Sequence, residues 1–120
     1  MDADVEFQKA ISLKSEKKFG QAVDILENLL PELPDSAALY VVLGDAYWEQ
    51  DELQKAIKCF QTATHLAPTS EIASLGLFNC LWESDEQKAA LEEVKRFLKL
   101  GDSDDYRDII REIHASICRD

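Results

Sequence analysis

The sequence has few basic residues. Its 13 lysines and arginines stand against 24 aspartates and glutamates, which gives a formal net charge of −11 at pH 7. Binding to nucleic acid requires a basic surface that displaces counterions, so this composition argues against a nucleic-acid partner. It disfavours an anionic membrane surface for the same reason. The charge favours a basic protein or peptide as the partner, although plain solubility explains an acidic surface equally well.

Cysteine and histidine are also scarce. The three cysteines, Cys59, Cys80 and Cys118, are scattered, form no CxxC pair and are odd in number. This pattern predicts neither a disulfide framework nor a structural metal site, and Cys59 and Cys80 are expected to be small core residues. His114 and Cys118 are four residues apart near the end of the chain, but two ligands do not make a metal site. We therefore expect neither a metal nor a cofactor.

Motifs for catalysis and for membrane insertion are absent. The chain contains no glycine-rich phosphate loop, no GxSxG elbow and no HExxH sequence, and its acidic residues follow the pattern of solvated helix faces. These absences argue against an enzyme and leave no candidate catalytic residue. No run approaches the about 18 consecutive apolar residues of a membrane helix. The N-terminus is acidic rather than a secretory signal, so we expect a cytoplasmic protein.

One segment carries a strong periodic pattern. Residues 37–70 have apolar and small side chains at helical spacing in two halves, which predicts two helices, each with one apolar face. Gly44, Ala56 and Ala63 are small enough for close helix packing, and Pro68 prevents the second helix from continuing. The larger residues of the pattern are Tyr40, Leu43, Tyr47 and Phe60. Together these residues resemble the tetratricopeptide repeat, a helix–turn–helix unit that stacks into a solenoid.

The same frame extends in both directions along the chain. A degenerate copy covers residues 3–36, and a weaker third copy covers residues 71–104. Because one repeat cannot bury its own apolar face, the resemblance implies an all-α α–α superhelix of about seven antiparallel helices, forming one domain over residues 1–120. The predicted helices are 3–16, 19–30, 36–50, 52–65, 70–84, 86–100 and 103–118.

Local signals refine this layout. Ser36 and Ser70 precede the first helices of the second and third copies and are candidate N-caps. Phe78 stands where the pattern has a small residue. We therefore expect it to push its helix pair apart or to be accommodated by small neighbours such as Ser74 and Ala90.

The last predicted helix, at about 103–118, is expected to cap the solenoid. Its apolar residues recur at helical spacing in one stripe, made of Tyr106, Ile109, Ile110, Ile113 and Ile117. We expect this stripe to cover the open end of the third repeat, near Val94 and Phe97, because the last repeat has no neighbour. Ser103 or Asp104 can cap the start of the helix. A helix that binds a partner is the weaker alternative.

The resemblance also implies where a partner would bind. In this family the first helix of each repeat lines a concave groove. The matching residues of this chain are Phe7, Ile11, Val41, Asp45, Trp48, Glu49, Leu75, Asn79, Trp82 and Glu83. Trp48 and Trp82 occupy one position in successive repeats and would form a ladder along the groove, unless they pack against adjacent helices instead. Asp45 and Asn79 could fix a partner's backbone or basic side chain, or be satisfied within the chain.

These observations favour a protein–protein interaction module whose groove is apolar and acidic. The expected partner is a protein or peptide segment with apolar side chains and net positive charge. Chaperone-binding members of the family hold a terminal carboxylate with a cationic clamp, which is absent here. The matching residues are Phe7, Ile11, Val42, Ile72 and Gly76. The alternatives are an acidic immunity or antitoxin-like inhibitor of a basic protein, an enzyme accessory subunit, and a homodimer formed through the open face.

Overall fold

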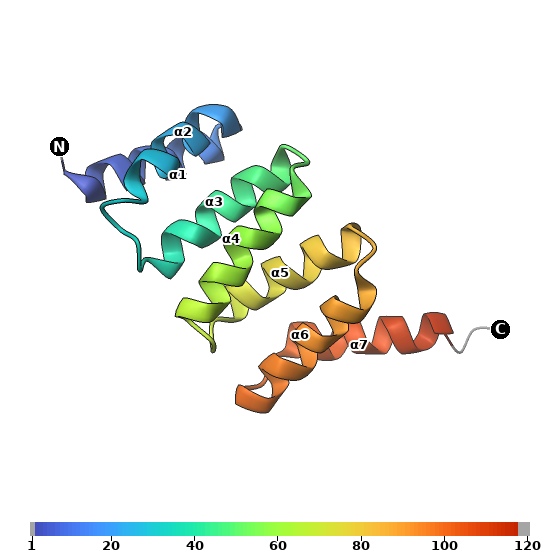
Figure 1. The fold of residues 1–120 in the computed structure, drawn as a ribbon. Helices are drawn as coiled ribbons and strands as arrows, with labels where there is room; N and C mark the ends of the chain where they lie inside the picture. The colour runs from blue at the N-terminus through green and yellow to red at the C-terminus, as the bar shows by residue number, and fades with distance from the viewer. Residues whose placement is uncertain (1, 118–120) are drawn as a thin grey trace.

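The computed structural model describes residues 2–117, and every regular element within them is an α-helix. The helices form three antiparallel pairs, followed by a seventh helix, in an elongated molecule of 56 by 27 by 20 Å (Figure 1). The prediction of an all-α superhelix is confirmed. Predicted helix ends are met to within one residue, except that the predicted end at residue 118 lies outside the described range. The helices are α1 Ala3–Ser15, α2 Phe19–Leu29, α3 Ala37–Glu49, α4 Leu53–Leu66, α5 Glu71–Glu83, α6 Gln87–Leu100 and α7 Asp104–Ile117.

Serine side chains cap three of the helices. Ser36 Oγ and Ser70 Oγ each accept a hydrogen bond from the backbone N–H three residues later, at 3.2 and 3.3 Å. Both caps that the sequence indicates are therefore present. Ser103 caps α7, because its Oγ accepts from the N–H of Tyr106 at 3.1 Å. Each serine satisfies one of the donors that a helix N-terminus leaves open.

The turn inside each pair has a conformation that the sequence did not suggest. Lys17, Asp51 and Asp85 occupy the same place in the three pairs, and their φ angles are positive, at 65°, 61° and 62°. The next residue donates its N–H back across the turn; Lys18 N, for example, lies 2.8 Å from Leu13 O. This is a Schellman ending, for which glycine is the usual residue because a side chain is strained at positive φ. The three turns share one geometry, so the chain reverses direction in the same way within each pair.

Tyr47 links the first pair to the second. Its side chain is 7% exposed, and its hydroxyl on α3 donates a hydrogen bond to the carboxylate of Glu27 on α2. Burial and the neighbouring carboxylate raise the pKa of Tyr47 far above its ordinary value. The hydroxyl therefore stays protonated, and remains a donor, throughout the neutral range.

One aromatic ring joins the second pair to the third. Phe60 on α4 is fully buried, and its ring lies against Gly44 on α3 and Gly76 on α5. A Cβ atom added at Gly76 would lie 2.3 Å from the ring, and one added at Gly44 would lie 3.0 Å from it. Because carbon atoms do not approach to 2.3 Å, a side chain at position 76 would force either the ring of Phe60 or one of the two helices to move.

We predict that Gly76→Ala lowers the free energy of unfolding by about 1–3 kcal/mol, because the added methyl group displaces Phe60 or separates α4 from α5. Gly20→Ala is the matched control, since its Cβ would meet nothing closer than the end of the Gln50 side chain, at 3.6 Å. Alanine is the better helix former, so this variant should be neutral or more stable by up to about 1 kcal/mol. Urea unfolding followed by circular dichroism measures both. Equal losses in the two variants would contradict the packing around Phe60.

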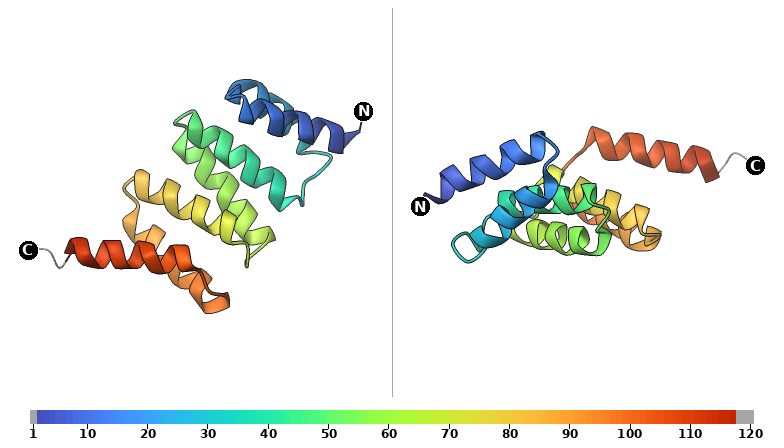
Figure 2. Two further views of the ribbon diagram at one scale, coloured as in Figure 1. Left: turned by 180° about the vertical axis from the view of Figure 1, so that it is seen from behind. Right: turned by 90° about the horizontal axis from the view of Figure 1, so that it is seen from above.

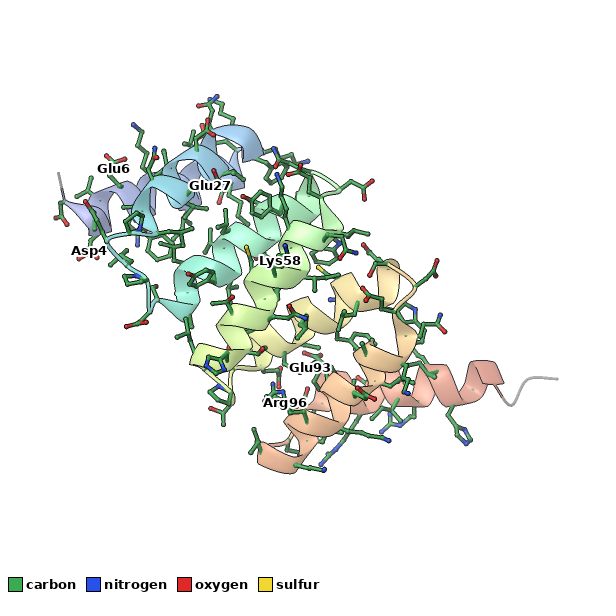
Figure 3. All side chains as sticks on the ribbon, in the orientation of Figure 1. Asp4, Glu6, Glu27, Lys58, Glu93 and Arg96 are labelled. Carbon is green, nitrogen blue, oxygen red and sulfur yellow. The ribbon has the colours of Figure 1, made fainter. Side chains whose placement is uncertain are left out.

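The start of α7 is fixed by a buried polar network on α5 and α6. Ser74 Oγ donates to Glu93 Oε2 at 2.6 Å and lies 2.5 Å from the hydroxyl of Tyr106. Arg96 donates two hydrogen bonds to Glu93, at 2.7 and 2.8 Å, and one to the carbonyl of Pro68, at 2.9 Å (Figure 3). Glu93 is 7% exposed, so its charge depends on Arg96 and Ser74 for compensation.

Aromatic rings surround this network at the end of the third pair. The ring of Tyr106 is fully buried and makes edge contacts with Phe97 and Phe78, with centroids 5.6 and 5.9 Å away. Phe78 in turn stacks on Trp82 at 5.7 Å. From the sequence we expected Phe78 to push its helix pair apart or to be accommodated by small neighbours in that pair. In the structure, α7 supplies part of its surroundings.

We predict that Arg96→Met lowers the free energy of unfolding by about 2–3 kcal/mol at neutral pH, since it leaves the carboxylate of Glu93 buried without its cation. Arg107→Met is the matched control, because Arg107 pairs with Asp102 and Asp104 at the exposed start of α7. Its loss should cost less than about 1 kcal/mol. Thermal and urea unfolding compare the two variants. If both lose the same stability, the buried network does not hold the third pair and α7 together.

Candidate interaction surfaces

The first helices of the three pairs form one side of the molecule. In the left-hand view of Figure 2, α1, α3 and α5 lie in front of α2, α4 and α6. In the right-hand view, α1 and α7 rise at the two ends, above α3 and α5. This side, which we call the first-helix side, therefore has α3 and α5 as its floor and α1 and α7 at its ends.

All ten residues predicted to line the groove lie on α1, α3 and α5. Eight of them are half-buried, and the two glutamates, Glu49 and Glu83, are exposed. The apolar ones that pack against the core while keeping part of the side chain exposed are Phe7, Val41, Trp48, Leu75 and Trp82. Ile72, at the start of α5, is 69% exposed. The first-helix side thus presents partly accessible apolar side chains with carboxylates beside them.

Polar residues connect successive helices across this side. Lys14 on α1 forms an ion pair with Asp45 on α3, with a distance of 3.2 Å between Nζ and Oδ2. Trp48 Nε1 on α3 donates to Glu83 Oε2 on α5 at 2.6 Å. Of the two interpretations of Asp45, satisfaction within the chain is the one that the structure shows. A basic partner residue would have to compete with Lys14 for this carboxylate.

The two tryptophans have different surroundings. The indole of Trp48 is bonded to Glu83, between α3 and α5, whereas the ring of Trp82 stacks on Phe78. Trp82 and Asn79 also border a pocket of about 590 Å³ between α5, α6 and α7. The two residues therefore lie at the C-terminal end of the first-helix side, next to α7.

This pocket, which we call the C-terminal wedge, was not foreseen from the sequence. Its lining residues are Phe78, Asn79, Trp82, Gln87, Leu91, Ile109, Glu112 and Ile113. The apolar stripe of α7 predicted a helix that covers the end of the third repeat. The structure covers Tyr106 fully but leaves Ile109 and Ile113 half-buried and Ile110 40% exposed. The angle of α7, which no local pattern encodes, opens the wedge.

A second pocket, of about 520 Å³, lies between α4, α5 and α6. Its floor is apolar, with Ile57 and Leu77, and its rim includes Lys58 and Arg96 as well as Glu93 (Figure 3). Charges of both signs surround it, and Arg96 already forms an ion pair with Glu93. This pocket therefore favours no ligand of one charge.

The thiols and metal-ligating residues of the described part do not form a reactive site. Burial raises the pKa of Cys59 to about 11 and that of Cys80 to about 12, so both thiols stay protonated at neutral pH. Within residues 2–117 no three histidine, cysteine, aspartate or glutamate side chains are placed to hold a metal ion. Cys118, considered above with His114, lies outside this range. None of the described helices combines the length and apolar character that crossing a membrane requires.

Stacked helix pairs with one free side define a helical-repeat protein, and comparison with known families identifies which kind. The tetratricopeptide repeat family matches residues 13–75, which is just over half of the chain. The chain therefore belongs to the tetratricopeptide repeat family. It is also 28% identical to Superkiller complex protein 3 of Homo sapiens over 102 residues, which cover 82% of this chain and 6% of that protein.

Solved structures show the same fold. The "MamA RS-1 ArsTM double mutant" superimposes with a TM-score of 0.78 and 26% identity, over 82% of this chain and 55% of that one. The first tetratricopeptide repeat domain of Spaghetti (RPAP3), bound to the HSP90 peptide SRMEEVD, gives a TM-score of 0.83 with 17% identity, over 96% and 92%. The Sgt2 domain from Aspergillus fumigatus gives 0.81 with 19% identity, over 95% and 80%. The chain thus spans about half of the MamA chain and a small part of the human protein.

Proposed function

We propose that the chain is a protein–protein interaction module that binds a segment of a partner protein along the first-helix side. The observation that carries this proposal is the row of partly accessible apolar side chains on α3 and α5, above all Val41, Trp48 and Leu75. Such side chains have a fixed position because they pack on the core, and they still offer area to a partner. Membership of the tetratricopeptide repeat family supports the proposal, because proteins of this family are in general interaction scaffolds.

The charge of the chain indicates the chemistry of the partner. The peptide bound by Spaghetti, SRMEEVD, contains three acidic residues and ends in one of them. This chain has a net charge of −11, and the positions that correspond to the family's cationic clamp are Phe7, Ile11, Val42, Ile72 and Gly76. A segment with apolar side chains and net positive charge fits this surface better than an acidic one does. The same net charge opposes association of a second copy.

An inhibitor of a basic protein, the alternative raised by the sequence, would use the same complementarity of charge. No feature among the described residues favours this narrower role over binding of a basic segment. The interaction module is therefore the function that we advance.

Selection from a random peptide display library, with the purified chain as bait, tests the proposal. We expect the enriched peptides to carry net positive charge and apolar residues, and to bind more weakly as salt concentration rises. Val41→Ser combined with Leu75→Ser should weaken binding of an enriched peptide by at least about tenfold, because it removes apolar contact from the floor of the first-helix side. Fluorescence anisotropy of the labelled peptide measures the affinity.

The control variant combines Val5→Ser with Leu100→Ser, which changes the same two residue types at exposed places outside the predicted groove. Val5 is 60% exposed on α1 and Leu100 is 53% exposed on α6. Circular dichroism verifies that both double variants are folded. Equal affinities for the two variants, or enriched peptides without positive charge, would refute the proposed surface or the proposed chemistry of the partner.

A further inference from the structure

The helix α7 is anchored at its start and only partly covered further along. Tyr106, in its first turn, is fully buried and bonded to Ser74. Further along, Ile109 and Ile113 are only half-buried, and backbone contacts between α7 and the preceding helices are few. The right-hand view of Figure 2 shows α7 lying above the layer formed by the preceding helices. The C-terminal wedge lies between the half-buried residues of α7 and the residues of α5 and α6 that face them.

The wedge has apolar walls on three helices. Trp82 and Phe78 come from α5, Leu91 from α6, and Ile109 and Ile113 from α7. Leu91 is 37% exposed, so its side chain is accessible and not part of the sealed core. A volume of about 590 Å³ lies within the range of pockets that hold ligands. Because the walls are helices and offer no strand edge, the mode of binding that fits them is an amphipathic helix inserted by its apolar face.

The charges at the wedge indicate whether that helix is basic or acidic. Glu112 is the charged side chain among the lining residues, and it enters none of the ion pairs formed within residues 2–117. Three other acids near α7 are neutralised within the chain, since Arg107 pairs with Asp102 and Asp104, and Arg111 pairs with Asp108. An unpaired carboxylate at the rim of an apolar pocket, in a chain of net charge −11, favours a cationic side chain opposite it.

We propose that the C-terminal wedge is a second docking surface, which takes a basic amphipathic helix of a partner protein. Its apolar face would lie against Leu91, Trp82 and Ile113, and a lysine or arginine would face Glu112. A second copy of this chain is a poor occupant, because two molecules of charge −11 repel each other. This inference goes beyond the proposed function, because it holds even if the surface of α1 and α3 binds nothing.

The two tryptophans of the chain allow the wedge to be monitored separately from the rest of the first-helix side. Trp48→Phe leaves Trp82, in the wedge, as the sole tryptophan, and Trp82→Phe leaves Trp48. The probe is a synthetic helical peptide of leucine and lysine, with the leucines on one face. We expect it to shift the emission of Trp82 to shorter wavelength in a saturable way. The same peptide with glutamate in place of lysine should bind at least about tenfold more weakly.

Matched variants in the Trp48→Phe background locate the binding site. Leu91→Glu should lower the affinity for the leucine–lysine peptide by at least about tenfold, because it places a carboxylate in the apolar wall. Leu100→Glu makes the same change on the same helix outside the wedge, where the leucine is 53% exposed, and should alter affinity by less than about twofold. Circular dichroism confirms that both variants fold.

Charge reversal tests the role of Glu112. Glu112→Lys should lower the affinity for the lysine peptide and raise the affinity for the glutamate peptide. Glu92→Lys changes the net charge equally but lies outside the wedge, so both effects should be smaller. The proposal is overturned if Leu91→Glu and Leu100→Glu behave alike, or if the peptide changes the emission of Trp48 alone. Dimerisation through the wedge would also overturn it, and would appear as a Trp82 signal that depends on protein concentration together with dimers in sedimentation. So would closure of α7 over the wedge, in which case acrylamide would not quench Trp82 and no peptide would bind.

Discussion

The contact on which the arrangement depends is the ring of Phe60 between two glycines. Phe60 projects from α4 into the space between α3 and α5, and that space exists because neither Gly44 nor Gly76 has a side chain. The ring therefore sets how closely the third pair approaches the second. With this separation, α3 and α5 lie side by side, and their outer faces form one continuous floor (Figure 2). The free side of the molecule is thus a consequence of how its core is packed.

The same packing limits how much apolar surface the free side exposes to solvent. Its apolar residues, such as Val41 and Leu75, pack partly against the core, so each of them exposes only part of its surface to solvent. The ion pair between Lys14 and Asp45 and the hydrogen bond from Trp48 to Glu83 connect successive helices across this side and satisfy their polar groups. At the C-terminal end a buried network holds the first turn of α7, whereas Ile109, Ile110 and Ile113 stay at least partly accessible.

The sequence was sufficient wherever the signal is local or periodic. The helix bounds follow from apolar spacing, and the caps at Ser36 and Ser70 follow from a serine placed just before an apolar run. It was insufficient where contacts come from distant segments. Gly76 is required by the ring of Phe60, which belongs to the preceding pair. The positive φ angles at Lys17, Asp51 and Asp85 were not predicted because none of these residues is glycine, the usual residue at such a position. The wedge could not be predicted because it depends on the angle at which α7 leaves Tyr106. The placement of the predicted groove residues on α1, α3 and α5 followed from the family frame, whereas the pairing of Asp45 with Lys14 did not.

The most direct measurement is backbone NMR of the chain titrated with a basic, apolar peptide obtained by selection. Chemical-shift changes should be concentrated on the first-helix side, largest around Val41, Trp48 and Leu75, while α2 and α4 change little and the helical content stays constant. Shifts concentrated on α2, α4 and α6, or binding that proceeds with the first-helix side unperturbed, would contradict the claim that this side is the one that holds the partner.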